Sequence, residues 1–273
     1  MRRTLFAIAI AAMASAVNAN AQFSAGVGYA NELIINKEAA VLTDGAKGYA
    51  WEKDRMSLNG FYVEGAYNWE FASVGPGKFA LQPAIRYYCL SDLKTNSRTN
   101  INMESEGATQ QTKSRSKTRI SNHVIDIPVN VKYAYDFIPG ALKGYVFAGP
   151  SFSLGIAANS LTKDKGSVSY NDKTIKGENI TRYNAYTGNY YIKTFDSASE
   201  ESKTEKGKND KYKEYNMFDL KLAIGIGITV AEKVDIKFGY NVGLLNRAFI
   251  KNTDSIKHSV HSNVLYFGAA YNF

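Results

Sequence analysis

Residues 218–243 read FDLKLAIGIGITV-AEK-VDIKFGYNVG, and this stretch decides the fold class. In both halves a large apolar residue alternates with a small, polar or charged one. A period of two is the pattern of a β-strand whose two faces meet different surroundings. We therefore expect two antiparallel strands joined by a tight turn at Ala231-Glu232. The face opposite the apolar one carries four charged side chains: Asp219, Lys221, Asp235 and Lys237.

The same alternation recurs along the chain and defines eight segments. We predict strands near residues 22–35, 57–71, 77–91, 121–137, 143–158, 214–231, 233–248 and 261–273. Each is at least as long as the roughly 9–11 residues that a tilted strand needs to cross a bilayer.

The connections between these segments alternate in length. Short ones contain Gly75-Pro76-Gly77, Ile138-Pro139-Gly140-Ala141 and Ala231-Glu232, whereas long ones cover 36–56, 94–120 and 159–213. A soluble β-sandwich also alternates, with its apolar side chains inward. Transmembrane β-barrels, however, combine short periplasmic turns with long extracellular loops. We therefore predict an all-β, eight-stranded antiparallel up-and-down transmembrane barrel, with both termini periplasmic.

The N-terminus has the pattern of an export signal. Arg2 and Arg3 precede an apolar run from Leu5 to Val17, and Ala19-Asn20-Ala21 fits a cleavage site. We expect residues 1–21 to be a signal peptide and residues 22–273 to form the barrel domain. Without the two arginines the net charge of +8 becomes +6. This mild basic excess, in an exported chain, does not indicate a nucleic-acid partner.

Three motifs resemble known outer-membrane families. The C-terminal Gly268, Tyr271 and Phe273 resemble the insertion signal that the barrel-assembly machinery reads. Residues 125–133, IDIPVNVKY, resemble the "I-P-x-x-x-K-Y" strand of PorT-like barrels, and residues 148–152, AGPSF, resemble their "G-P-x-F" strand. The mature chain thus resembles the outer-membrane β-barrel domain families, including small barrels of the OmpA and OmpX kind. The resemblance implies a membrane barrel and names no activity; some relatives belong to a secretion apparatus.

If the apolar faces meet lipid, the other faces line the lumen. They carry the predicted lumen charge network of five acids and four bases: Glu64, Glu70, Asp126, Asp219, Asp235, Arg86, Lys132, Lys221 and Lys237. An eight-stranded barrel is just wide enough for side chains to fill, and buried charges need partners. Balanced signs predict mutual pairing and a plugged lumen, with a narrow water-filled pore as the alternative. If Phe71 faces Phe79, Glu64 faces Arg86, because both pairs of residue numbers sum to 150.

The long connections hold the candidate contact surfaces. Residues 94–120 carry six bases and two acids, a net charge of +4, for which a solvated loop and a site for anionic sugar or lipopolysaccharide are both open interpretations. Residues 182–195 are expected to form a hairpin that presents aromatic side chains for recognition. Its candidate contact residues are Tyr183, Tyr186, Tyr190, Tyr191 and Phe195. Residues 196–213 are charged and expected to be flexible.

Catalysis and metal binding have weaker support. His123 follows Ser121, and His258 and His261 flank Ser259, so a Ser–His enzyme acting on lipid is one hypothesis. Strand residues three apart point to opposite faces, which makes His258 and His261 poor co-ligands of one metal. No cofactor is expected, and one cysteine, Cys89, cannot form an internal disulfide.

Three functions follow from these patterns. The leading hypothesis is a non-enzymatic outer-membrane barrel that acts as a structural, adhesion or docking element. The second is a narrow porin-like channel, and the third is a lipid-modifying enzyme. The expected partners are outer-membrane lipid with lipopolysaccharide, the barrel-assembly machinery, and a protein or glycan bound through the long connections.

Overall fold

The fold is known from a computed structural model, which describes residues 21–41, 49–105, 108–170, 173–196, 201–249 and 256–273. The predicted signal peptide therefore lies outside the described residues, apart from Ala21. Within these ranges there are eleven strands and one short 3₁₀ helix. The elements are β1 Ala21–Val41, β2 Tyr49–Val74, β3 Gly77–Ser105, β4 Ala108–Ile138, β5 Leu142–Tyr170, β6 Lys173–Asn184, β7 Asn189–Asp196, β8 Glu201–Lys208, η1 Asp210–Tyr212, β9 Phe218–Val230, β10 Val234–Gly243 and β11 Ile256–Asn272.

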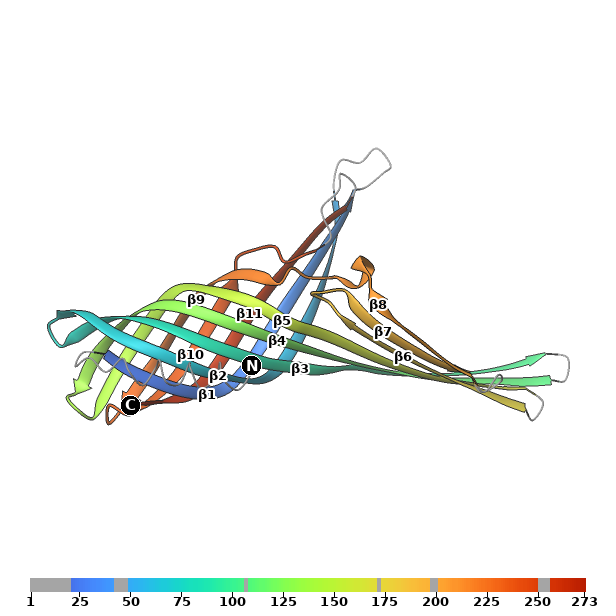
Figure 1. Cartoon of the computed structure of the whole chain (residues 1–273), viewed down its shortest axis with the longest axis horizontal. Coiled ribbons are helices and arrows are strands. Elements are labelled where there is room, and N and C mark those ends of the chain that lie inside the picture. Colours follow the sequence, from blue (N-terminus) through green and yellow to red (C-terminus); the bar gives the residue numbers. More distant parts are fainter. Residues whose placement is uncertain (1–20, 42–48, 106–107, 171–172, 197–200, 250–255) are drawn as a thin grey trace.

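Eight of these strands close into a ring. Strands β1 to β5 pair in chain order, β5 continues to β9, and β9, β10 and β11 follow in turn. The last strand, β11, pairs with β1 over Ser24–Ala40, and every pairing is antiparallel. The ring thus has the up-and-down topology that the sequence predicts (Figure 1). No helix in the described part of the chain is long and apolar enough to cross a membrane.

The two faces of the ring differ as the alternation predicts. On β9, Leu222 and Ile224 are exposed, whereas Ala223, which lies between them in the sequence, is fully buried. On β10, Phe238 is exposed and Lys237 is buried. On these two strands, apolar side chains therefore cover the outside of the ring, and small or charged ones point into it. A bilayer would remove this outer apolar surface from water, which is the setting that such a surface requires.

At one end of the ring, short turns join the described strands. Gly75 and Gly140 adopt positive φ angles of 58° and 74° in two of them. In the third, Ala231 and Glu232 also have positive φ angles, which is the backbone of a two-residue hairpin turn that matches strand twist. We call this the turn end. The chain closes there, because the Phe273 N–H donates to the Phe23 carbonyl at 2.8 Å and the two rings stack with centroids 5.7 Å apart.

At the other end, the mouth end, most of the described residues of the long connections form strands, so the interpretation of residues 94–120 as a solvated loop was wrong. Strands β3, β4 and β5 run far beyond the ring, and β6, β7 and β8 add to their sheet (Figure 1). Residues 112–119 read TKSRSKTR, so hydroxyl residues alternate with cations. This is the two-residue period of a strand, but it is formed by polar residues, so a search for alternating apolar residues does not detect it. Residues 201–208, expected to be flexible, form β8.

The sixth and seventh predicted strands are shorter than expected. Strand β9 begins at Phe218, not at residue 214, and β10 ends at Gly243, not at residue 248. The chain leaves the ring at these points and makes other backbone contacts: Asn216 N–H donates to the Arg247 carbonyl at 2.7 Å, and Tyr215 bridges Ala248. These segments cover the mouth of the ring.

The register between β2 and β3 follows the predicted sum of 150 from Asn59↔Ser91 to Glu70↔Ala80. A β-bulge between Glu70 and Ala72 then shifts it, so Phe79 faces Ala72 and not Phe71. The expected Phe71–Phe79 opposition was therefore wrong by one residue, although the rings remain 6.4 Å apart. The bulge lies below Glu64 and Arg86, which are direct partners as predicted.

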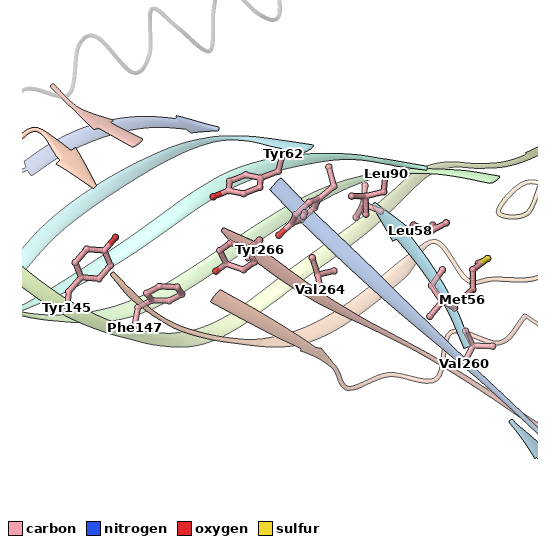
Figure 2. Packing of buried hydrophobic residues seen from close by; sticks show 13 residues of the cluster. Met56, Leu58, Tyr62, Leu90, Tyr145, Phe147, Val260, Val264 and Tyr266 are labelled. Carbon is pink, nitrogen blue, oxygen red and sulfur yellow. The ribbon is translucent and has the colours of Figure 1, made fainter. Parts of the chain in front are cut away.

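The interior is more apolar and aromatic than the sequence suggested. Figure 2 shows Tyr62, Tyr266, Tyr145 and Phe147 lying between the strands of the ring, and all four are buried. Gly28 and Gly268 face each other across β1 and β11 and admit the Tyr62 ring. A Cβ on Gly268 would lie 2.4 Å from the Tyr62 hydroxyl and 2.6 Å from the Val27 carbonyl oxygen. Gly268 therefore has a packing role that its place in a terminal motif does not reveal.

Candidate functional site

Four charged residues meet in the middle of the ring; we call them the central network, formed by Glu64, Arg86, Asp126 and Lys237. The Arg86 Nε donates to Glu64 Oε2 at 2.7 Å, and a second guanidinium nitrogen forms an ion pair with the same carboxylate. Lys237 from β10 also donates to Glu64. One carboxylate therefore binds two cations, and all three side chains are almost fully buried.

The other contacts of Arg86 complete this network. Its Nη1 lies 3.9 Å from Asp126 Oδ2 and donates to the Tyr88 hydroxyl at 2.9 Å. The guanidinium lies 4.1 Å from the centre of the Tyr266 ring, a cation–π distance. Asp126 in turn accepts hydrogen bonds from Ser153 at 2.5 Å and Asn241 at 3.1 Å. Two acids and two bases thus balance in a space closed by aromatic rings.

Below this level lies a second pair, Lys132 and Asp235, at 3.6 Å. Asp235 also accepts from Thr229 at 2.5 Å and from Asn272 at 3.2 Å, and the Lys132 ammonium lies 3.8 Å from the centre of the Tyr145 ring. Beneath it a polar vestibule of about 380 Å³ opens toward the turn end. Glu70, predicted in the lumen, sits at this rim, half-exposed and bound to Lys78 at 3.1 Å.

Asp219 and Lys221, the two remaining residues of the predicted lumen network, are buried near the mouth end. No side chain among the described residues donates a hydrogen bond to either carboxylate oxygen of Asp219. Its compensation comes from the nearby positive charges of Lys221 and Arg247. This is the least satisfied part of the interior.

A cluster that the sequence did not reveal closes the mouth. This mouth network consists of Glu32, Asn122, Tyr186, Arg247 and Ser262. The Tyr186 hydroxyl donates to Asn122 Oδ1 at 2.8 Å and accepts from Arg247 at 2.6 Å. Glu32 accepts from Asn122 at 2.6 Å and from Ser262 at 2.5 Å, and lies 3.7 Å from Arg247. Five segments far apart in the sequence are joined across the opening.

The turn that carries Tyr186 is built to hold it there. Ala185 N–H donates to the Ala158 carbonyl at 2.7 Å, and Gly188 takes a positive φ of 73°. Gly155 leaves room for the ring, because a Cβ there would lie 2.3 Å from Tyr186 Cζ. Burial raises the pKa of Tyr186, so the hydroxyl keeps the proton that it donates. The cavity beneath measures about 20 Å³, enough for about one water.

The five predicted contact residues divide into three groups. The predicted hairpin forms between β6 and β7, but Tyr186 in its turn is buried, and its expected exposure was wrong. Tyr183 and Tyr190 pack on Tyr212, with ring centroids 5.4 Å and 4.9 Å away. Burial, together with a hydrogen bond to Glu214, raises the pKa of Tyr183 to about 12. Only Tyr191 and Phe195 are exposed, at 37% and 40%.

His123 contacts a tyrosine, and Ser121 faces other residues in the sheet. A ring nitrogen of His123 lies 2.8 Å from the Tyr87 hydroxyl, and Ser121 faces Asn159 and Ser91 in the sheet. His258 lies 3.9 Å from Glu38. Within the described residues, the Ser–His–acid arrangement that the enzyme hypothesis needs does not form around His123.

The residues of the terminal motif lie on the seam between β1 and β11. Tyr271 is outward and 45% exposed, and Phe273 is 71% exposed. Their rings pack edge to face at 5.1 Å. The aromatic pair thus forms an outward apolar rim at the turn end.

Comparison with known proteins gives a family match and several similar solved structures. A family model described as an outer membrane protein β-barrel domain matches residues 18–247. Similar solved structures include Ail of Yersinia pestis, crystallised with the heparin analogue sucrose octasulfate, at 15% identity over 93% of this chain and 99% of that one, with a TM-score of 0.28. Neisserial surface protein A is 14% identical over 92% and 97%, with a TM-score of 0.31. The Escherichia coli protease OmpT is 9% identical over 95% and 99%, with a TM-score of 0.35. No curated protein matches.

Proposed function

The chain belongs to the outer membrane protein β-barrel domain family, and we propose that it is a non-conducting barrel that anchors a surface sheet used for docking. The surface sheet consists of the parts of β3, β4 and β5 beyond the ring together with β6, β7 and β8. The observation that carries the proposal is the closed interior: a buried, charge-balanced centre beneath a mouth covered by Tyr186 and Arg247.

Closure follows from the energetics of the interior. A conducting lumen needs water along its length, whereas Arg86, Asp126 and Tyr266 are each at most 1% exposed. Buried charges are tolerated where partners compensate them. Opening this core to water would separate Glu64 from two cations and Arg86 from the Tyr266 ring. These coupled contacts favour one packed state of the interior.

The orientation rests on the distribution of connections. Family barrels have short turns on the periplasmic side and long extracellular connections, so the surface sheet lies outside the cell. Both termini then lie in the periplasm, where removal of residues 1–21 by a signal peptidase would occur. Strands β4 and β5 pair as far as Gln110↔Tyr170, about 12 residues beyond the mouth at Asn122. At about 3.4 Å per residue this places the tip about 40 Å from the ring.

A narrow channel is the second candidate. The vestibule at the turn end and the poorly compensated Asp219 favour it, since a path from one to the other would be polar. Such a channel would open only if Tyr186 left the mouth. The two candidates therefore differ in a measurable property.

We expect the purified wild-type protein to give no steady ion current in planar lipid bilayers, because the central network blocks the lumen. The variant Tyr186→Ala, which uncovers only the mouth, should also stay closed. A conducting porin in the same bilayer is the positive control. A stable ohmic current from the wild type would contradict the proposal, and a larger current from Tyr186→Ala would establish the gated channel.

Topology is tested by labelling single cysteines in a Cys89→Ser background. In intact cells, a membrane-impermeant maleimide should label Ser116→Cys, in the part of β4 beyond the ring, within the time that labels a known surface protein. Ser73→Cys, next to the turn at Gly75, should react only after lysis. Both positions are polar strand residues, so they form a matched pair. Labelling in the reverse order would show that the surface sheet faces the periplasm.

A further inference from the structure

The surface sheet has two faces of opposite character. On β4, Lys113, Arg115, Lys117 and Arg119 alternate with serines and threonines, and all four cations are exposed. Because successive strand residues point to opposite faces, the four cations share one face. Residues i and i+2 on a strand are about 6.8 Å apart, so these four form a row about 20 Å long.

The neighbouring strands add cations to the same face. In the register, Arg115 faces Lys165 and Lys117 faces Lys163. Following the pairings onward to β8 assigns eleven exposed cations to this basic face: Lys113, Arg115, Lys117, Arg119, Lys163, Lys165, Lys176, Arg182, Lys193, Lys206 and Lys208. With Glu178 as its one acid among the described side chains of β4 to β8, its net charge is +11 − 1 = +10. The other face carries Lys203 against Asp164, Glu201 and Glu205, a net charge of 1 − 3 = −2.

This arrangement does not serve the stability of the sheet. Like charges directly opposite each other across an antiparallel pair are destabilising, and the basic face has two such pairs side by side. Of the four cations in these pairs, Lys165 forms an ion pair, with Glu178 at 3.2 Å. Inside the ring, by contrast, opposite charges face each other, as Glu64 and Arg86 do. The repulsion on the basic face would be relieved by a bound polyanion.

Aromatic side chains lie on the same face. Arg182 faces Tyr191, which faces Lys206, and Glu178 faces Phe195. Tyr191 and Phe195 are thus the two exposed members of the predicted contact hairpin, and both project among the cations. A flat aromatic surface gives the apolar face of a sugar ring a place to pack. Cations with interleaved aromatic rings suit a charged polysaccharide better than a charged peptide.

We propose that the basic face binds a linear anionic polysaccharide outside the cell, through its sulfate, phosphate or carboxylate groups. This deepens the docking role proposed above and rests on it. Lys113 lies nine residues beyond Asn122 on β4, about 30 Å along the strand from the mouth at about 3.4 Å per residue. The cations are thus spread along a sheet that extends away from the ring, and we infer that the ligand is an extended chain and not the lipid headgroups beside the ring.

The test measures binding of dextran sulfate to the purified full-length protein in detergent by isothermal titration calorimetry, with neutral dextran as the reference. We expect saturable binding to dextran sulfate that weakens as salt rises, because the contacts are solvent-exposed charges. Neutral dextran should not bind. Absence of dextran sulfate binding at low salt would overturn the proposal.

The deciding variant exchanges faces without changing composition or net charge. It combines Ser114→Arg with Arg115→Ser and Ser116→Lys with Lys117→Ser, which moves two cations to the other face of β4. The matched control exchanges cations within the basic face: Arg115→Lys with Lys117→Arg. We expect the face exchange to weaken binding about tenfold, equivalent to about 1.4 kcal/mol, and the control to bind like the wild type.

Other outcomes identify other ligands. Equal binding by the face-exchange variant and the wild type would show that net charge, and not the basic face, attracts the polyanion. Polyglutamate binding as tightly as dextran sulfate would favour an acidic protein. Binding to lipopolysaccharide vesicles but not to dextran sulfate would assign the face to the membrane. Each of these outcomes would overturn the polysaccharide proposal. None would contradict the closed barrel or its topology, which the conductance and labelling experiments test separately.

Discussion

Replacing Phe273 by serine is expected to remove most of the folded protein from the outer membrane. The aromatic ring is 71% exposed, so its loss costs little packing within the ring. The backbone N–H of residue 273 can still donate to the Phe23 carbonyl in the variant. A large effect would therefore come from assembly, because Phe273 and Tyr271 form the aromatic pattern that we propose the barrel-assembly machinery recognises. The measurement is the heat-modifiable band in fractionated membranes.

The matched control is Phe267→Ser on the same strand. Phe267 is also outward and exposed, at 54%, but is remote from the terminus. We expect a several-fold smaller loss of folded protein than for Phe273→Ser. Equal losses in the two variants would mean that outward apolar area matters and the terminal position does not. Wild-type amounts of folded Phe273→Ser would show that this terminus is not the assembly signal.

Gly268→Ala separates the third residue of the motif from the other two. The added Cβ would meet the Val27 carbonyl oxygen and the Gly28 Cα, which are backbone atoms and cannot rotate away. Overpacking of this kind typically costs about 1–3 kcal/mol. The variant should thus be less stable once folded, whereas Phe273→Ser should lose less stability, since its exposed ring contacts only Phe23 and Tyr271 among the described aromatic rings. This contrast distinguishes packing at Gly268 from recognition at Phe273.

Replacing Arg86 by alanine is expected to lower the free energy of unfolding by about 3–5 kcal/mol, the usual cost of leaving a buried charge without its partner. The loss leaves Glu64 with Lys237 alone and removes the cation nearest to Asp126. The central network would then hold two acids and one base. Urea unfolding in lipid vesicles, followed by tryptophan fluorescence, measures the change.

A double-mutant cycle with Glu64→Ala tests the pairing itself. The double variant keeps Lys237 and Asp126, so one charge of each sign remains and the network is neutral again. We expect it to be more stable than the sum of the two single changes predicts, with a coupling within the range of about 0.5–3 kcal/mol seen for contacting residues. As a control, Glu70→Ala with Lys78→Ala removes a half-exposed pair, for which less than about 1 kcal/mol is expected. A coupling of zero for Glu64 and Arg86 would contradict the closed centre.

Much of the ring was determined by the sequence itself. Alternation in residues 218–243 assigns the outer and inner faces because side-chain direction on a strand is a local property with a fixed period. Gly75 and Gly140 marked two of the turns, because glycine readily takes the positive φ angles that these turns require. The prediction that Glu64 faces Arg86 is confirmed. Its premise, that Phe71 faces Phe79 at the turn, was wrong, and the bulge after Glu70 is what brings the strands into the predicted register at Glu64.

The same local reasoning failed where the period was polar or broken. In the surface sheet, β4 alternates hydroxyl residues with cations over residues 112–119, so this segment lacks the apolar signal used to find the other strands. The bulge at Glu70 adds one residue to β2. Whether it forms depends on the pairing with β3, which the sequence of β2 alone does not show. Tyr186 was placed with exposed aromatics because nothing in residues 182–195 shows that this turn folds back onto the ring.

Only the tertiary structure decided which groups share the interior. Lys237 reaches Glu64 across the ring from a strand 173 residues later in the chain, and Tyr186 and Arg247 meet Asn122 and Glu32 over the mouth. Such contacts exist only after β11 has closed on β1, since closure brings opposite walls within side-chain reach. The sequence determines the faces of each strand because they follow from local geometry; the partners across the lumen, and the two unlike faces of the surface sheet, follow from the order and register in which eleven strands pair.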